Sequence, residues 1–312
     1  MLKNAVPSDL APLDACISTP EKCVLAVIIG VDGPSYRPIG AMMAFFENSD
    51  PVGSLSSGCI ESDIGLHAVD CLKSGKSRIV RYGRGSPYVD IVLPCGGGLE
   101  ILLLPNPNQD VIGEILQTVV AERKTCTLKI HLDTGALSIS SGDVCGPASE
   151  AFTTTILPEL RFLIFGKGPE ALAFAALTQS AGFEPTVLSP DTPTLDAARE
   201  MSCHCIELTT PKFPDELSAD ARTAIVLFFH DHDWEPPILR DAFMTSAFYI
   251  GAQGSQRARD LRLAALRELG INDSGLARLS GPIGLISSAR DPKTLAISVL
   301  AEVVSRGNLE RI

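Results

Sequence analysis

The hydrophobic positions of the chain follow two patterns, and each predicts one type of element. Apolar residues at every third or fourth position predict amphipathic helices, whereas short apolar runs bounded by glycine or proline predict strands. In the first half these patterns predict strands at residues 23–31, 41–46, 78–82, 88–93, 99–104, 125–132 and 136–140, and helices at residues 60–73 and 110–122. This mixed order indicates an α/β domain.

Strands and helices alternate regularly in the second half. The predicted strands are at residues 161–166, 185–188, 204–207, 224–229 and from 248, and the predicted helices are at 170–181, 194–201, after 255 and at 294–304. This alternation is typical of a doubly wound, Rossmann-like parallel sheet.

The length of 312 residues allows two domains of ordinary size. Residues 141–158 contain glycine, proline, serine and three consecutive threonines without periodicity, which favours a linker. We therefore expect an N-terminal mixed α/β domain at 1–140, a linker at 141–158 and a Rossmann-like domain at 159–312.

Composition and charge exclude several classes of protein. The net charge of −11 is divided almost evenly between the two halves, so we expect no nucleic-acid partner. The longest apolar run, residues 24–31, is shorter than the roughly 20 residues of a membrane span, and the N-terminal residues lack the apolar core of a signal peptide. We expect a cytoplasmic protein with no membrane partner, whose nine scattered cysteines are free thiols.

Cys59 lies in a small-residue turn just before the predicted helix at 60–73. A thiol near a helix start has its anion favoured by the helix dipole, which suits a nucleophile or a soft metal ligand. Glu61 and Asp63 oppose this effect, since nearby negative charge disfavours a thiolate. The alternative is that Cys59 is a small apolar residue that packs beneath the helix.

A second cysteine, Cys95, is followed directly by three glycines, of which Gly96 and Gly97 are the first two. Glycines at this position let the backbone approach a ligand closely, and they equally suit a tight β-turn. Arg37 is the only cation in the turn at residues 33–40. It either clamps an anionic ligand or lies at the surface over Tyr36.

The second half opens with the pattern of a dinucleotide-binding turn. An apolar strand runs into Gly166-x-Gly168-x-x-Ala171 and then a helix, and Asp191 follows the next strand as a candidate ribose-binding acid. Pro169 removes one N–H from the anion cradle. The turn therefore predicts either bound NAD(P) or another nucleotide, or a Rossmann fold without one.

His230 begins the sequence His-Asp-His-Asp233 directly after the fourth strand of this half. In a doubly wound sheet the fourth strand lies beside the first, so these residues would face the Gly166 turn across the crevice. They predict either a metal site or a polar crevice wall.

Ser255 is a candidate N-cap of the following helix, which carries Arg257, Arg259 and Arg262 in its first turns. This arrangement predicts either an anion site or a solvated basic face, with Leu261, Leu263 and Leu266 supplying the core-facing side.

Together these segments resemble the XdhC/CoxI family of xanthine dehydrogenase accessory proteins over nearly the full length of the chain. The similar segments occur in the family's order and are Gly33-Pro-Ser-Tyr-Arg-Pro-Ile-Gly-Ala41, residues 53–61, Cys95-Gly-Gly, Gly166-Lys-Gly, His230-Asp-His, Tyr249-Ile-Gly through Ser255 and Gly281-Pro-Ile-Gly-Leu. The chain departs from the family at Pro169, where a histidine is usual, and at Ser57, where a glycine is common.

The resemblance implies an accessory chaperone of the molybdenum cofactor (molybdopterin) rather than an enzyme. Such proteins bind the cofactor, protect it while a cysteine desulfurase supplies its sulfido ligand, and deliver it to apo xanthine dehydrogenase or a related molybdenum hydroxylase. A homodimer is also implied.

The resemblance also implies a site for this cofactor. The thiols would contact its molybdenum, Arg37 would lie near its phosphate, and the Rossmann crevice would form the other wall. The implied residues are Cys59, Cys95, Arg37, Gly58, Gly96, Gly97, Gly166, Gly168, Asp191, His230 and Ser255.

The alternative function is an NAD(P)-dependent oxidoreductase. It would hold the cofactor at Gly166, Gly168 and Asp191 and move a proton through His230 or His232. This hypothesis accounts for the second half and leaves both cysteine turns unexplained.

Overall fold

The computed structural model describes residues 9–56, 58, 60–87, 93–94, 96–140, 146–148, 150–230 and 233–309. The chain forms two compact units, Met1–Pro158 and Glu159–Ile312. Each unit has its own hydrophobic core.

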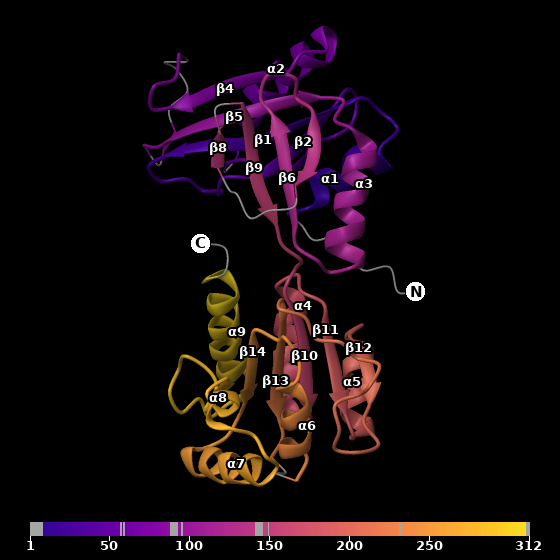
Figure 1. Ribbon diagram of the computed structural model, residues 1–312, viewed down its shortest axis with the longest axis vertical. Helices are drawn as coiled ribbons and strands as arrows, with labels where there is room; N and C mark the ends of the chain where they lie inside the picture. Colours follow the sequence, from indigo (N-terminus) through magenta and orange to yellow (C-terminus); the bar gives the residue numbers. More distant parts are fainter. Residues whose placement is uncertain are drawn as a thin grey trace. The chain divides into compact units, whose positions relative to one another are not determined.

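The first unit is built on a five-stranded antiparallel sheet of order β3-β2-β1-β5-β4 (Figure 1). Its strands are β1 (Cys23–Asp32), β2 (Met42–Phe46), β3 (Val52–Gly53), β4 (Arg78–Gly83) and β5 (Gly98–Pro105). The central strand β1 is apolar on both faces, because alternate side chains of a strand point to opposite sides. Leu25 and Val27 enter one core, and Val24 and Ala26 enter the other.

One face of this sheet is covered by α2 (Glu61–Ser74), which buries Ile64 and Ala68 against it. The other face packs against α1 (Ala11–Ser18), α3 (Gln109–Leu116) with its π-helical extension (Gln117–Ala121), and a second antiparallel sheet. That sheet has the order β7-β6-β9-β8 and comprises β6 (Cys126–His131), β7 (Leu137–Ser140), β8 (Gly146–Ala148) and β9 (Ala151–Ile156).

The segment at 141–158, which we expected to be a linker, contains β9 instead. This strand pairs with β6 along its whole length and buries Phe152 and Ile156. The three consecutive threonines suggested a linker because they are polar, but they are β-branched and therefore suit a strand. The predicted strand at 88–93 falls mainly on residues 88–92, which lie outside the described residues.

The second unit is a six-stranded parallel sheet of order β12-β11-β10-β13-β14-β15. Numbered within the unit, this is the doubly wound order 3-2-1-4-5-6 that the alternation predicted. The strands are β10 (Arg161–Gly166), β11 (Pro185–Ser189), β12 (His204–Glu207), β13 (Thr223–Phe228), β14 (Tyr249–Ala252) and β15 (Leu279–Ser280).

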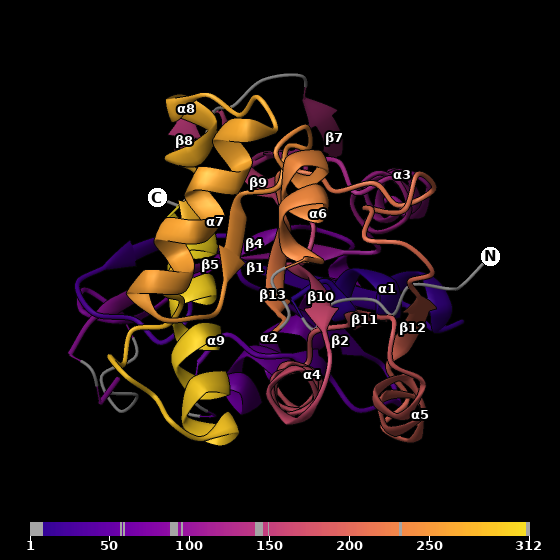
Figure 2. The ribbon, with the colours of Figure 1, turned by 90° about the horizontal axis from the view of Figure 1, so that it is seen from below.

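Helices cover both faces of this sheet, and Figure 2 shows them on either side of the strands. On one face, α4 (Pro169–Ser180), α5 (Thr192–Glu200) and α9 (Pro292–Leu309) enclose a core that includes Phe162 and Phe174. On the other, α6 (Glu235–Ala242), α7 (Gln256–Glu268) and α8 (Asp273–Leu276) pack over Phe165 and Leu227. No helix in the described part of the chain has the length and apolar composition needed to cross a membrane.

Candidate functional site

Three turns of the first unit meet at one end of the five-stranded sheet, where β1 and β4 end and β5 begins. Gly98 pairs with Asp32 on one side and with Gly83 on the other. The backbone N–H of Arg84 also donates to the carbonyl oxygen of Gly97 at 3.0 Å. We call this place the glycine-turn end and define it by residues 32–34, 83–85 and 96–98.

The glycines at the glycine-turn end meet two different requirements. A Cβ on Gly97 would overlap the carbonyl oxygen of Pro34, and one on Gly83 would overlap the carbonyl oxygen of Gly97, so the turns can meet only without side chains there. Gly96 has a φ of +71°, and a Cβ built on it would meet no atom within 4 Å. Backbone packing therefore requires Gly97, whereas the space beside Gly96 is open.

The turn before α2 is organised by the carboxylate of Glu61. This carboxylate accepts the Ser56 N–H at 2.8 Å, the Ser56 hydroxyl at 2.6 Å and the Ile60 N–H at 3.2 Å. Burial acts to raise the pKa of Glu61, but these hydrogen bonds outweigh it and hold the pKa below its usual range. The helix N-cap is Ile60, which makes no side-chain capping hydrogen bond.

The same turn lies beside the end of β4. The Tyr82 hydroxyl donates to Asp63 of α2 at 2.6 Å, and Tyr82 directly precedes Gly83. Leu55 and Ile60 share one buried core with Leu93. Cys59 and Cys95 themselves lie outside the described residues, but residues close to each of them pack into a single core. Gly58 has a φ of +93°, with no atom within 4 Å of a built Cβ.

Arg37 is held by an ion pair. Its guanidinium lies 2.8 Å from the Asp9 carboxylate, and the Ser35 hydroxyl donates to its carbonyl oxygen at 2.7 Å. The side chain is 36% exposed. An anionic ligand at Arg37 would therefore compete with Asp9.

Two further arginines, which the sequence analysis missed, lie at the glycine-turn end. Arg81 binds Glu100 at 2.7 Å, lies 3.5 Å from Asp32, and donates from Nε to the carbonyl oxygen of Arg84 at 2.8 Å. It thus ties two of the turns, at Asp32 and Arg84, to strand β5. Arg84 lies 3.5 Å from Asp32, and its side chain is 64% exposed. The signal that could have found them is the regular spacing Arg78-x-x-Arg81-x-x-Arg84 around Gly83. The strand prediction for this segment rests on its apolar residues alone.

In the second unit the two glycines of the Rossmann turn are positioned as the sequence predicted. A Cβ on Gly166 would lie 2.6 Å from the carbonyl oxygen of Phe228 in the neighbouring strand β13. The Gly168 N–H donates to the Thr194 hydroxyl oxygen at 2.9 Å. The carboxylate of Asp191 caps α5 and accepts the Thr194 N–H at 2.9 Å and the Thr194 hydroxyl at 2.5 Å. These bonds hold the pKa of Asp191 below its usual range.

His230 lies where the strand order placed it, across from the Gly166 turn. Its Nε2 is 3.4 Å from Oε2 of Glu170, in the first turn of α4, and its side chain is 66% exposed. The following residues 231 and 232 lie outside the described residues, and no cluster of three metal-binding side chains occurs among those described.

Ser255 caps α7, as predicted, by accepting the Ala258 N–H at 3.2 Å. The arginines behind it differ in exposure: Arg257 is exposed, Arg259 is half-buried and Arg262 is buried. Arg262, expected in an anion site or on a solvated face, is buried against Glu235 at 2.8 Å and also donates to the carbonyl oxygen of Gln253 at 2.6 Å. Leu261, expected to face the core, is 57% exposed. Leu266 is buried and Leu263 packs against the same core, as expected, so the orientation of the helix agrees with the prediction except at Leu261 and Arg262.

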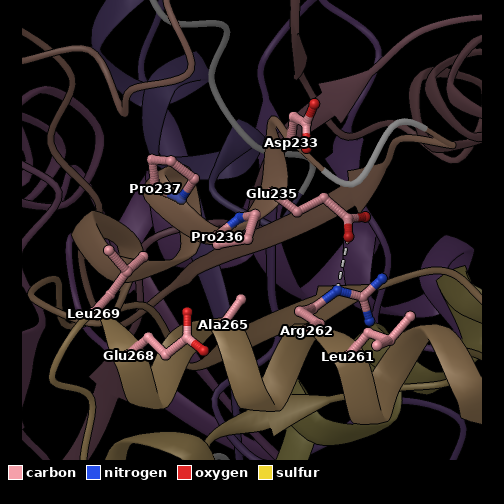
Figure 3. Close-up of a pocket in the computed structure, with 9 residues that line it drawn as sticks. All are labelled: Asp233, Glu235, Pro236, Pro237, Leu261, Arg262, Ala265, Glu268 and Leu269. Carbon is pink, nitrogen blue, oxygen red and sulfur yellow. Dashed lines mark hydrogen bonds and ion pairs between the residues drawn. The ribbon is translucent and has the colours of Figure 1, made fainter.

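The Glu235–Arg262 pair forms part of the wall of a cavity of about 430 Å³ between α6 and α7 (Figure 3). Pro236 and Pro237 line one side, and Ala265 and Leu269 line the other. Because the two charged side chains are 0% and 2% exposed and bind each other, they connect the helices.

Comparisons with known proteins agree with this two-unit architecture. A family profile described as the XdhC Rossmann domain matches residues 162–303, and one described as the XdhC and CoxI family matches residues 16–83. The molybdenum cofactor insertion chaperone PaoD of Escherichia coli (strain K12) is 34% identical over 291 residues, which cover 90% of this chain and 82% of that protein.

Two further proteins are similar over almost their whole length. A probable xanthine dehydrogenase subunit from Bacillus subtilis (strain 168) is 24% identical, covering 94% of this chain and 95% of that one. The crystal structure of a xanthine dehydrogenase from Bacillus halodurans has the same fold, with a TM-score of 0.79 at 23% identity over 96% of this chain and 95% of that chain. Because the similarity to PaoD extends across most of both proteins, the chain belongs to the XdhC and CoxI family.

Proposed function

We propose that this chain binds the molybdenum cofactor and inserts it into an apo molybdenum hydroxylase of the xanthine dehydrogenase type. The observation that carries the proposal is the identity of 34% to a molybdenum cofactor insertion chaperone over 90% of the chain. The cofactor is cargo in this function, so the chain must hold it firmly enough to protect it and release it to the partner.

The glycine-turn end is the proposed binding site for the cofactor. Backbone turns without side chains let a large planar ligand approach the main chain, and the open space beside Gly96 and Gly58 supports such an approach. Arg81 ties the turns at Asp32 and Arg84 to strand β5, which preorganises this end of the sheet.

Cys59 and Cys95 are the proposed soft ligands for molybdenum, on the basis of the sequence. The donors that bind Glu61 and Asp63 are neutral, so the negative charges of these acids still oppose a thiolate at Cys59. The start of α2 is the feature that favours one, through the helix dipole.

The cofactor's phosphate would bind a cation at this end of the sheet. Arg37 is the candidate from the sequence, and the exposed Arg84 is a second candidate from the structure. The proposed partners are the apo-hydroxylase, which receives the cofactor, and a cysteine desulfurase, which supplies its sulfido ligand. We also propose a homodimer.

Cofactor retention tests the proposal. The full chain is purified from a host that makes the cofactor, oxidised, and assayed for the fluorescent pterin released per chain. We expect pterin from the wild type, a loss of at least about tenfold for Cys59→Ser, and no loss for the control Cys205→Ser in the second unit. Arg84→Gln, directly after β4, is compared with Arg78→Gln, an exposed arginine at the start of that strand.

The delivery step is tested by producing the hydroxylase with and without this chain. We expect an inactive, cofactor-deficient hydroxylase in its absence. A wild-type chain that retains no pterin, together with a fully active hydroxylase in its absence, would show that the chain is not an insertion chaperone.

A further inference from the structure

In the Rossmann turn of the second unit, the backbone N–H groups around the second glycine are either bonded within the chain or missing. In dinucleotide-binding folds the pyrophosphate accepts from backbone N–H groups of the glycine turn and the first turn of the helix. Here the Gly168 N–H already donates to the Thr194 hydroxyl oxygen at 2.9 Å. The next residue is Pro169, which has no N–H, and the Lys167 N–H points to the carbonyl oxygen of Phe228 at 3.4 Å.

An anion of the chain itself lies at the same place. Oε2 of Glu170 is 4.0 Å from the position of a Cβ on Gly168 and 3.4 Å from Nε2 of His230. The Glu170 side chain is 21% exposed. A carboxylate in the first turn of a helix is favoured by the helix dipole, as a bound phosphate would be. A pyrophosphate entering here would meet this negative charge at short range.

One oxygen of the acid available for a ribose, Oδ2 of Asp191, is engaged as well. Asp191 accepts both the N–H and the hydroxyl of Thr194. Thr194 therefore links the glycine turn to the acid after β11. Its hydroxyl accepts from the Gly168 N–H and donates to the Asp191 carboxylate. Both groups that would recognise a dinucleotide are bonded to this side chain.

We infer that this crevice does not bind NAD(P). Side chains of the chain itself, Thr194 and the Glu170 that pairs with His230, occupy the position that the pyrophosphate of a dinucleotide takes in other Rossmann folds. The glycines of the turn then serve packing, as Gly166 does against Phe228. The crevice presents a carboxylate and an imidazole instead of an anion cradle. The inference is independent of the proposed function and argues against a nicotinamide-dependent oxidoreductase.

Titration of the full-length chain with NADH and NADPH, followed by cofactor fluorescence and calorimetry, tests the inference. We expect no saturable binding up to about 1 mM for the wild type, which is the weak end of ordinary substrate affinities. Glu170→Gln removes the charge and keeps the shape, and Thr194→Val frees the Gly168 N–H. The double variant should bind NADH at least about tenfold more tightly than the control Glu200→Gln, an exposed acid on α5.

Two results would overturn the inference. One is wild-type binding with a Kd below about 100 µM. The other is a double variant that binds no better than Glu200→Gln although its thermal unfolding shows a folded domain. If the double variant does not fold, the single variant Glu170→Gln is titrated instead. An NADH affinity equal to that of Glu200→Gln would then overturn the inference.

Discussion

Glu61 shows how a single side chain can order the turn before a helix that has no side-chain cap. Its carboxylate accepts hydrogen bonds from the backbone of Ser56 and Ile60, on both sides of Cys59 in the sequence, and from the Ser56 hydroxyl. The sequence analysis considered Glu61 only as a negative charge near a thiol. In the structure its carboxylate holds Ser56 and Ile60 in place.

This role predicts a pH-dependent stability of the first unit. The pKa of Glu61 is lower in the folded chain than its ordinary value of 4.5, so its contribution to stability is present above about pH 4.5. That contribution is lost as the pH falls through the folded pKa. We expect Glu61→Gln to cost about 1–2 kcal/mol near pH 7 and to flatten the decline in stability between about pH 5 and pH 3.

Denaturant unfolding at a series of pH values measures this effect. Glu47→Gln, an exposed acid before β3, is the control and should follow the wild-type profile. If Glu61→Gln declined with pH as steeply as the wild type, the carboxylate of Glu61 would not be the group that stabilises the turn.

At the scale of elements, one ion pair connects α6 and α7 in the second unit. Arg262 and Glu235 bind each other and are both almost fully buried (Figure 3). The Arg262 guanidinium also donates to the carbonyl oxygen of Gln253, directly after β14. Removing one member of a buried pair leaves the other charge uncompensated, whereas replacing both with apolar residues is far less costly.

We therefore expect Arg262→Met to lower the free energy of unfolding by about 3–5 kcal/mol. The double variant Arg262→Met, Glu235→Leu should recover at least half of that loss. Arg267→Met removes an exposed arginine from the same helix, whose pair with Asp273 is solvated, and should cost less than about 1 kcal/mol. Equal losses for Arg262→Met and Arg267→Met would contradict a structural role of the buried pair.

At the scale of the whole molecule, the chain consists of two units that meet in sequence between Pro158 and Glu159. The position of this boundary depends on β9, which lies between β6 and β8 in the second sheet of the first unit. A fragment that ends at residue 140 lacks this strand and leaves the β6 edge unpaired.

We expect fragments 1–158 and 159–312 each to unfold cooperatively, because each carries its own core. Fragment 1–140 should lack a cooperative transition or aggregate, since it loses Phe152 and Ile156 from the core and exposes a strand edge. Circular dichroism during heating distinguishes these outcomes. A fragment 1–140 as stable as 1–158 would show that β9 is dispensable for the fold.

Much of the second unit is predictable from the sequence because its signals are local. A buried parallel strand is a short apolar run, and the glycine turn, helix start and next strand follow within about 25 residues. The strand order then followed from the general topology of doubly wound sheets, including the position of His230 beside the first turn. The glycine-rich turns of the first unit were equally visible.

Other features depend on residues that are far apart in the sequence. Thr194 meets Gly168, Arg81 joins Asp32 to Glu100, and Arg262 turns inward to Glu235. No local pattern distinguishes a buried arginine from an exposed one on the same helix, because the difference depends on the charge that a distant element brings to it.

By itself, then, the sequence determined the two classes of domain, the glycine turns, most strands and helices, and the family resemblance, because these depend on neighbouring residues and their periodicity. Only the tertiary structure decided that three turns meet at one end of the first sheet and that the Rossmann turn is filled by the chain's own side chains. The physical reason is that hydrogen bonds and ion pairs are satisfied in space, so the donors free for a ligand are known only once the folded partners are in place.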